Sequence, residues 1–235
     1  MFNLTLAQGQ TLYAHSWYVT DDKLNPITQY KKDEVRSIAS LTKLITVMVA
    51  IDDGRADPVL VEDAMVRSSN WAATLLCKKY SKGYRDCIAA MNKKVQALGA
   101  SKTVLVEPTG LSRKNQSTAH DIALIVNAAR RYPAIVDASH RRTIHRGRMV
   151  FKNTNPTVDE KTVVSKTGWT IASGGCIAVM YNNRIYVILG SRDTHTRVND
   201  LLELRSRYNR PTTESESNND NAQEQLWTNP WDQIW

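Results

Sequence analysis

The chain has 235 residues, of which 42% are hydrophobic and 23% are charged, and its formal net charge is +8. This length and composition allow one domain with a good core and room for two lobes. No apolar run approaches the roughly 18 residues of a membrane-spanning helix. Residues 1–10 lack the basic start and the long apolar stretch of a secretory signal, so we expect a mature form or a protein made in the cytosol.

Charge is unevenly distributed along the chain. The residues after Arg210 include five acidic side chains and no Lys or Arg, so the rest of the chain carries +13 once they are removed from the net +8. Such a surface favours polyanions, among which nucleic acid and the carboxylate-rich bacterial wall both qualify. The sequence contains neither zinc-finger spacing nor the aromatic-basic pattern of an RNA-binding sheet, so we expect no nucleic-acid partner.

The N-terminal part predicts a β-hairpin followed by an interior helix. β-forming residues fill residues 11–20, and a turn at residues 21–23 leads to a second strand over residues 27–30. The side chains after Lys43 are apolar almost all round as far as Ile51, which predicts a helix running through the protein interior. Gly54 can supply its left-handed C-terminal cap.

Helical patterns dominate the middle of the chain, over residues 61–66, 70–80 and 84–98. Thr118 and Asp121 resemble a capping box that opens a further helix to about Arg131, which Pro133 ends. Strand composition returns over residues 162–165, 176–181 and 184–189. Asn182-Asn183 joins the last two as a tight hairpin, and residues 201–208 predict a closing helix.

Strands at both ends with helices between them predict a mixed α/β (α+β) fold. Its antiparallel sheet is flanked by helices, and a helical lobe is inserted at about residues 55–140. We expect residues 1–210 to form the catalytic domain and residues 211–235 a disordered, acidic tail. Three tryptophans end that tail, so it could dock onto a partner or onto the body, or it could be an unselected terminus.

Three cysteines do not make a disulfide framework. Cys77 and Cys87 flank a predicted turn and could pair, but we favour free buried thiols in a reducing compartment. Cys176 has the surroundings of a small core residue in a strand.

Ser40 and Lys43 form a Ser-x-x-Lys motif at the start of the interior helix. Residues three apart on a helix share a face, so the amine can take the hydroxyl proton and create a nucleophile. Burial lowers a lysine pKa, as a general base at neutral pH requires. The motif alone also fits a core helix with an incidental Ser and Lys.

Two further motifs follow in order, Ser68-Ser69-Asn70 and Lys166-Thr167-Gly168. The ordered set of Ser-x-x-Lys, Ser-x-Asn and Lys-Thr-Gly is typical of penicillin-binding proteins and serine β-lactamases. The chain resembles the D-alanyl-D-alanine carboxypeptidase/endopeptidase family, the low-molecular-mass penicillin-binding proteins, and most closely its endopeptidase branch. The resemblance extends to the segments Ala39–Leu44, Glu107–Ser112, Asn115–Asp121 and Ser165–Thr170.

This resemblance implies the β-lactamase/transpeptidase-like fold and an acyl-serine mechanism without metal or cofactor. Ser40 matches the nucleophile and Lys43 its base. Ser68 and Asn70 match the pair that passes protons to the leaving amine and holds the substrate amide. The remaining correspondences are Lys166 and Thr167 with the carboxylate-binding residues, Gly168 with the position open to backbone approach, and the N–H groups of Ser40 and Trp169 with the oxyanion hole.

The implied activity is cleavage of D-Ala-containing bonds in peptidoglycan stem peptides, with β-lactam antibiotics as covalent inhibitors. A β-lactamase would need a second base, for which Glu107 is the tempting carboxylate, and a catalytically silent wall-binding protein is the other alternative. Two features depart from the family. The family is normally exported, so this chain would need lysis, a particle or another route to the wall, and its interval between Lys43 and Ser68 is short.

Overall fold

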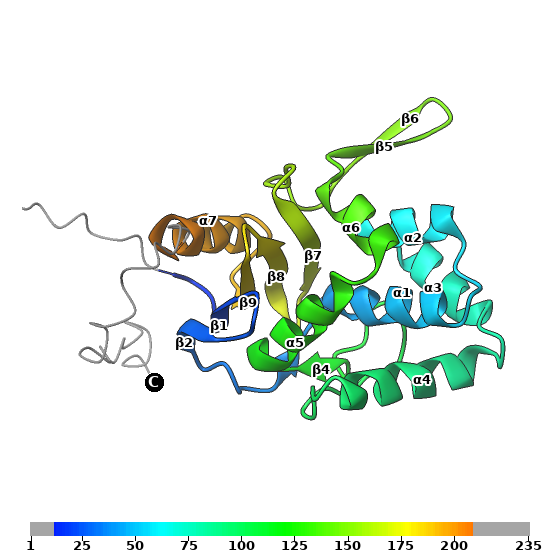
Figure 1. Cartoon of the computed structure of the whole chain (residues 1–235), viewed down its shortest axis with the longest axis horizontal. Coiled ribbons are helices and arrows are strands. Elements are labelled where there is room, and N and C mark those ends of the chain that lie inside the picture. Colours follow the sequence, from blue (N-terminus) through cyan, green and yellow to red (C-terminus); the bar gives the residue numbers. More distant parts are fainter. Residues whose placement is uncertain (1–11, 209–235) are drawn as a thin grey trace, which may run out of the picture.

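A five-stranded antiparallel sheet forms one half of the protein in the computed structural model, which describes residues 12–208 (Figure 1). The strand order is β2-β1-β9-β8-β7, so the first strands pair with the last ones. The strands are β1 (Ser16–Asp21), β2 (Pro26–Tyr30), β7 (Thr162–Thr170), β8 (Gly174–Tyr181) and β9 (Arg184–Ser191). The predicted antiparallel sheet, in which strands from the first and last parts of the described residues pair, is confirmed.

Helices cover both faces of the sheet and fill the other half of the molecule (Figure 1). They are α1 (Thr42–Asp52), α2 (Pro58–Met65), α3 (Asn70–Lys78), α4 (Tyr84–Ala97), α5 (Ala119–Ala129), α6 (Pro133–His140) and α7 (Thr196–Tyr208). α5 packs against β1, β8 and β9, whereas α7 packs against β8 and β9. Within the described part of the chain, no helix is long and apolar enough to cross a membrane.

The helix α1 is the centre of the core. Nine of its eleven residues are buried, because α2, α3, α4 and α5 all pack around it. A 3₁₀ turn, η1 (Ala39–Leu41), precedes α1 and packs against β7 and β8. The first residues of this buried helix therefore lie where the helical half meets the sheet.

Three features of the fold were not predicted: one helix and two pairs of short strands. Pro133 begins α6 instead of ending a helical region, because a proline fits the first turn of a helix, where its missing N–H has no partner to lose. The hairpin of β5 (Thr143–Arg146) and β6 (Met149–Lys152) projects from the body (Figure 1). A further small pair joins β3 (Arg36–Ser37) to β4 (Gln116–Ser117).

The observed ends of several strands differ from the predicted ends by a few residues. β1 begins at Ser16, later than the predicted strand over residues 11–20, and β7 runs on through Gly168 to Thr170. Asn182 and Asn183 both adopt positive φ, as a two-residue hairpin with right-handed strand twist requires. The predicted acidic tail over residues 211–235 lies outside the described residues.

The expectation of free thiols at Cys77 and Cys87 was wrong, because the two residues form a disulfide. Cys77 lies on α3 and Cys87 on α4, and the turn between these helices brings their Cα atoms to 5.5 Å. The bond ties together two helices of the helical half. Cys176 is free and buried, as predicted.

Candidate active site

Ser40 lies on η1 and Lys43 on the first turn of α1, so both stand at the junction between the sheet and the helices. The Lys43 Nζ is 2.8 Å from the Ser40 Oγ. The turn that presents Ser40 is tightly packed, since a methyl group added at Gly110 would come within 1.9 Å of the Ala39 carbonyl oxygen. Ala39 itself has φ +45°, an uncommon conformation for a residue with a side chain.

Lys43 is fully buried and has two other partners. Its Nζ is 2.7 Å from the Asn70 Oδ1 and 2.6 Å from the Thr109 carbonyl oxygen. A neutral amine has two N–H bonds and one lone pair. Asn70 and Thr109 can accept both N–H bonds, which leaves the lone pair for the Ser40 hydroxyl.

Burial lowers the pKa of Lys43 from 10.5 to about 7, although the negative charge of Glu107 acts in the opposite direction. A large share of Lys43 is therefore neutral near pH 7, and its lone pair can take the Ser40 proton.

The segment before α3 supplies a second hydroxyl. Ser68 has φ +58°, a conformation that L-residues adopt at a cost and that often marks functional sites. Ser69 caps α3, because its Oγ accepts a hydrogen bond from the Ala72 N–H at 3.2 Å. That cap fixes where α3 begins and so sets Asn70 beside Lys43.

Lys166 reaches across from β7 and donates to the Ser68 Oγ at 2.9 Å and to the Thr167 carbonyl oxygen at 3.0 Å. It is buried, and burial together with the positive charges of Lys43 and Arg197 lowers its pKa well below the usual value. A carboxylate arriving beside Lys166 would restore its charge, since an opposite charge raises the pKa of an amine. The position of Lys166 therefore favours the binding of an anionic ligand.

Gly168 brings β7 directly against Ser40. A methyl group added at Gly168 would lie 2.7 Å from the Ser40 backbone nitrogen and 2.9 Å from the Ala39 Cβ. Glycine is needed here because the two backbones approach so closely. Trp169, the next residue, is half exposed at the surface.

Three contacts of the site were not foreseen in the sequence. The Thr109 carbonyl accepts from Lys43, the buried Arg197 donates to the Gly168 carbonyl oxygen at 2.6 Å, and the Thr154 hydroxyl lies 2.7 Å from that of Thr167. Of these residues, Thr109 lies in the segment Glu107–Ser112, whose resemblance to the family is the sequence feature that could have pointed to it.

The carboxylate of Glu107, the candidate second base, makes its hydrogen bonds within its own loop and with Asn115. Its carboxylate accepts hydrogen bonds from the backbone N–H groups of Thr109 and Gly110, each at 2.7 Å, and from the Thr109 hydroxyl at 2.6 Å. The Asn115 side chain donates to it at 2.9 Å. Glu107 therefore organises the loop that carries the Thr109 carbonyl. Residues 12–208 also hold no cluster of three side chains able to bind a metal ion.

Among the solved structures that share this fold are a penicillin-binding protein and a DD-transpeptidase. Penicillin-binding protein D2 from Listeria monocytogenes, in its cefotaxime-bound form, aligns with a TM-score of 0.75 and 21% identity, covering 84% of this chain and 97% of that one. The Streptomyces K15 DD-transpeptidase aligns with a TM-score of 0.76 and 18% identity, covering 84% and 97%. The protein thus has the penicillin-binding protein/transpeptidase fold.

Sequence relatives narrow this class to one family. The D-alanyl-D-alanine carboxypeptidase family matches residues 56–190. The D-alanyl-D-alanine endopeptidase of Escherichia coli is 32% identical, over 74% of this chain and 70% of its own length. The enzyme of the same name from Pseudomonas aeruginosa is 32% identical, over 83% and 77%. The chain belongs to the D-alanyl-D-alanine carboxypeptidase family of serine DD-peptidases.

Proposed function

We propose that this protein cleaves D-Ala-containing peptide bonds of bacterial peptidoglycan by way of an acyl-serine intermediate. The observation that carries the proposal is the position of Lys43, which is buried, hydrogen-bonded to Ser40 and lowered in pKa to about 7. A neutral amine on a serine hydroxyl is the arrangement that turns serine into a nucleophile.

In the acylation step, Lys43 takes the Ser40 proton while the Oγ attacks the D-Ala carbonyl carbon. The backbone N–H groups of Ser40 and Trp169 receive the developing oxyanion. The C–N bond then breaks, and the proton that Lys43 took from Ser40 passes by way of Ser68, which also contacts Lys166, to the leaving amine, so that Lys43 is neutral again. In the second step water attacks the acyl-serine and gives its proton to Lys43, and Lys43 returns that proton to the Ser40 Oγ as the acid leaves.

Substrate binding falls to the remaining residues. Lys166 and Thr167 hold the carboxylate next to the leaving amine, and Asn70 holds the substrate amide. Gly168 lets the peptide backbone approach β7. β-Lactam antibiotics enter the same reaction, because their lactam carbonyl takes the place of the scissile one, and they remain bound to Ser40.

We infer a preference for cross-linked peptides over free pentapeptides. Both relatives described above are named endopeptidases. We expect the short interval between Lys43 and Ser68 to leave one wall of the active site more open, and the excess positive charge to concentrate the enzyme on an anionic polymer. The bacterial wall or periplasm is the proposed place of action. Delivery by lysis or a particle, or as a mature form, stays a prediction, as does docking of the tryptophan-containing tail.

Digestion of purified sacculi tests this function. Chromatography should show cross-linked dimers converting to monomers, with slower loss of terminal D-Ala from pentapeptides. Ser40→Ala should abolish both reactions, and added salt should slow the digestion of sacculi more than that of small neutral peptides. Release of D-Ala faster than loss of dimers would replace the endopeptidase with a carboxypeptidase.

A further inference from the structure

A basic pocket lies beside the nucleophile, at the end of β7 that Lys166 does not occupy. The pocket holds about 610 Å³. Its lining comes from β3 and the residue before it, from the loop that leads into β4 together with β4 itself, and from the turn after β7: Val35, Arg36, Ser37, Arg113, Lys114, Gln116 and Ala172. The lining contains three cations and no carboxylate.

Two of these cations have unneutralised charges. Arg36 forms an ion pair with Glu34 at 2.5 Å. Arg113 and Lys114 are exposed, and neither makes an ion pair within the described part of the chain. The walls also hold two polar atoms, the Ser37 Oγ and the Arg36 Nε, that are buried without a hydrogen-bond partner among residues 12–208. A recess lined by one sign of charge concentrates anions.

The distance from this pocket to the reacting bond is short. Ser37 precedes Ser40 by three residues, and Ala172 follows Trp169 by three residues. Since an extended chain covers at most about 3.5 Å per residue, both walls of the pocket begin within about 11 Å of the reaction centre. A substrate peptide needs two or three residues to cover the same distance.

The direction in which the substrate peptide lies along β7 determines which part of the peptide reaches the basic pocket. β7 is an edge strand of the sheet, and an extended peptide can lie along such a strand. In the proposed function, the carboxylate beside the leaving amine is held at Lys166 and Thr167, and the carbonyl under attack lies at Gly168 and Ser40. The acyl side of the peptide must then continue past Trp169 towards Ala172.

We propose that Arg113 and Lys114 form a subsite for carboxylates carried by the second and third residues on the acyl side of the scissile bond. This inference rests on the proposed function, since the direction of the peptide comes from it. The subsite would select acidic stem peptides over their amidated forms. Arg113 and Lys114 would then bind particular carboxylates of the substrate, in addition to the general attraction of the basic protein to the anionic bacterial wall.

The test compares two synthetic peptides that end in D-Ala-D-Ala. One carries side-chain carboxylates on the second and third acyl-side residues, and its twin carries amides. Wild-type protein should prefer the acidic peptide by roughly fivefold to tenfold in kcat/KM, the value expected for two half-exposed ion pairs. The double variant Arg113→Ala/Lys114→Ala should lose this preference and keep its rate on the amide twin.

A matched variant, Lys78→Ala/Lys82→Ala, removes the same charge from α3 and the turn after it, and it should keep the preference. Arg113→Glu should reverse the preference. An undiminished preference in the Arg113/Lys114 double variant, or its absence from the wild type, would overturn the subsite.

Benzylpenicillin separates this inference from the proposed function, because it lacks the extended acyl side. It should acylate the wild type and all variants at equal rates, which also shows that they are folded. Failure to acylate the wild type would refute the proposed function, whereas normal acylation with an unchanged peptide preference would refute the subsite alone.

Discussion

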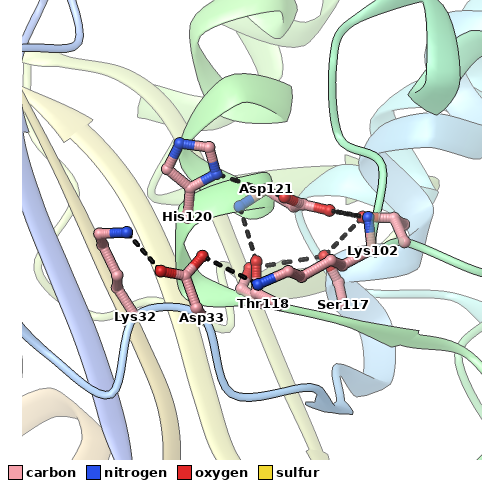
Figure 2. A network of polar contacts seen from close by, with 8 residues as sticks. Lys32, Asp33, Lys102, Ser117, Thr118, His120 and Asp121 are labelled. Atoms are coloured by element: carbon pink, nitrogen blue, oxygen red, sulfur yellow. Dashed lines mark hydrogen bonds and ion pairs between the residues drawn. The ribbon is translucent and has the colours of Figure 1, made fainter.

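The candidate active site and the polar network at the start of α5 contain the same residue types, lysines and hydroxyl side chains, but in different surroundings. In the network, Asp121 accepts from the Lys102 N–H at 2.8 Å and from the Thr103 hydroxyl at 2.9 Å, and Lys102 forms an ion pair with Asp33 at 3.3 Å (Figure 2). Thr118 caps α5 by accepting from the Asp121 N–H at 3.0 Å (Figure 2).

The difference between the two regions lies in the surroundings of the lysines. Lys102 is half exposed and forms an ion pair with the Asp33 carboxylate. Lys43 and Lys166 are buried and make no ion pair within residues 12–208, and the pKa of each falls. Desolvation disfavours the charged form of both amines, but only Lys43 contacts the Ser40 hydroxyl and can act as its base, whereas a carboxylate ligand would return Lys166 to its charged form.

The largest effect should come from Lys43→Arg. Arginine stays charged at every working pH and cannot accept the Ser40 proton, so acylation by benzylpenicillin should fall by about 10²–10⁴-fold. Lys102→Arg makes the same exchange in the network and should leave the rate unchanged. Stopped-flow kinetics or mass spectrometry measures the acylation rates of the two variants. Equal losses of rate in Lys43→Arg and Lys102→Arg would contradict the difference that we draw between the two regions.

Lys166→Arg should have an intermediate effect. The cation is kept, but the larger guanidinium must fit a fully packed position beside Ser68. The value of kcat/KM for peptides should fall by about tenfold to a hundredfold, mostly through KM. Steady-state kinetics on a D-Ala-D-Ala peptide measure the change, and a loss as complete as that of Lys43→Arg would show that both lysines act as bases.

Asp121→Ala should affect stability and spare the chemistry. It removes the acceptor of the Lys102 N–H and one of the two partners of the buried Thr103 hydroxyl, at a cost of about 1–3 kcal/mol in the free energy of unfolding. Urea unfolding measures that cost. The acylation rate per folded molecule should match the wild type, and a lowered rate would mean that the network also positions the cleft.

The sequence motifs picked out side chains that the structure brings together, because each motif is local. Ser40 and Lys43 meet through helical spacing, and Gly168 is needed wherever two backbones approach as closely as β7 and η1 do. The antiparallel sheet was also predictable, since strand composition in both the first and the last parts of the sequence leaves few arrangements. These features depend on neighbours in sequence or on simple topology.

Features that depend on tertiary packing escaped prediction. The Thr109 carbonyl carries no sequence signal because every residue has one, and Arg197 meets the Gly168 carbonyl only because α7 folds back on the sheet. Cys77 and Cys87 pair because the α3–α4 turn sets two helices side by side. The role of Pro133 was predicted wrongly because proline occurs both just after a helix and in the first turn of a helix.

The pH dependence of Ser40 acylation tests the central claim most directly. The base must be neutral, and the neutral fraction of Lys43 grows as pH rises through its pKa of about 7. Mass spectrometry of the Ser40 peptide after brief exposure to benzylpenicillin should therefore show a rate that rises with pH, reaches half its maximum near pH 7 and then levels off. A rate that stays constant between pH 5 and 9, or label on a residue other than Ser40, would contradict the account.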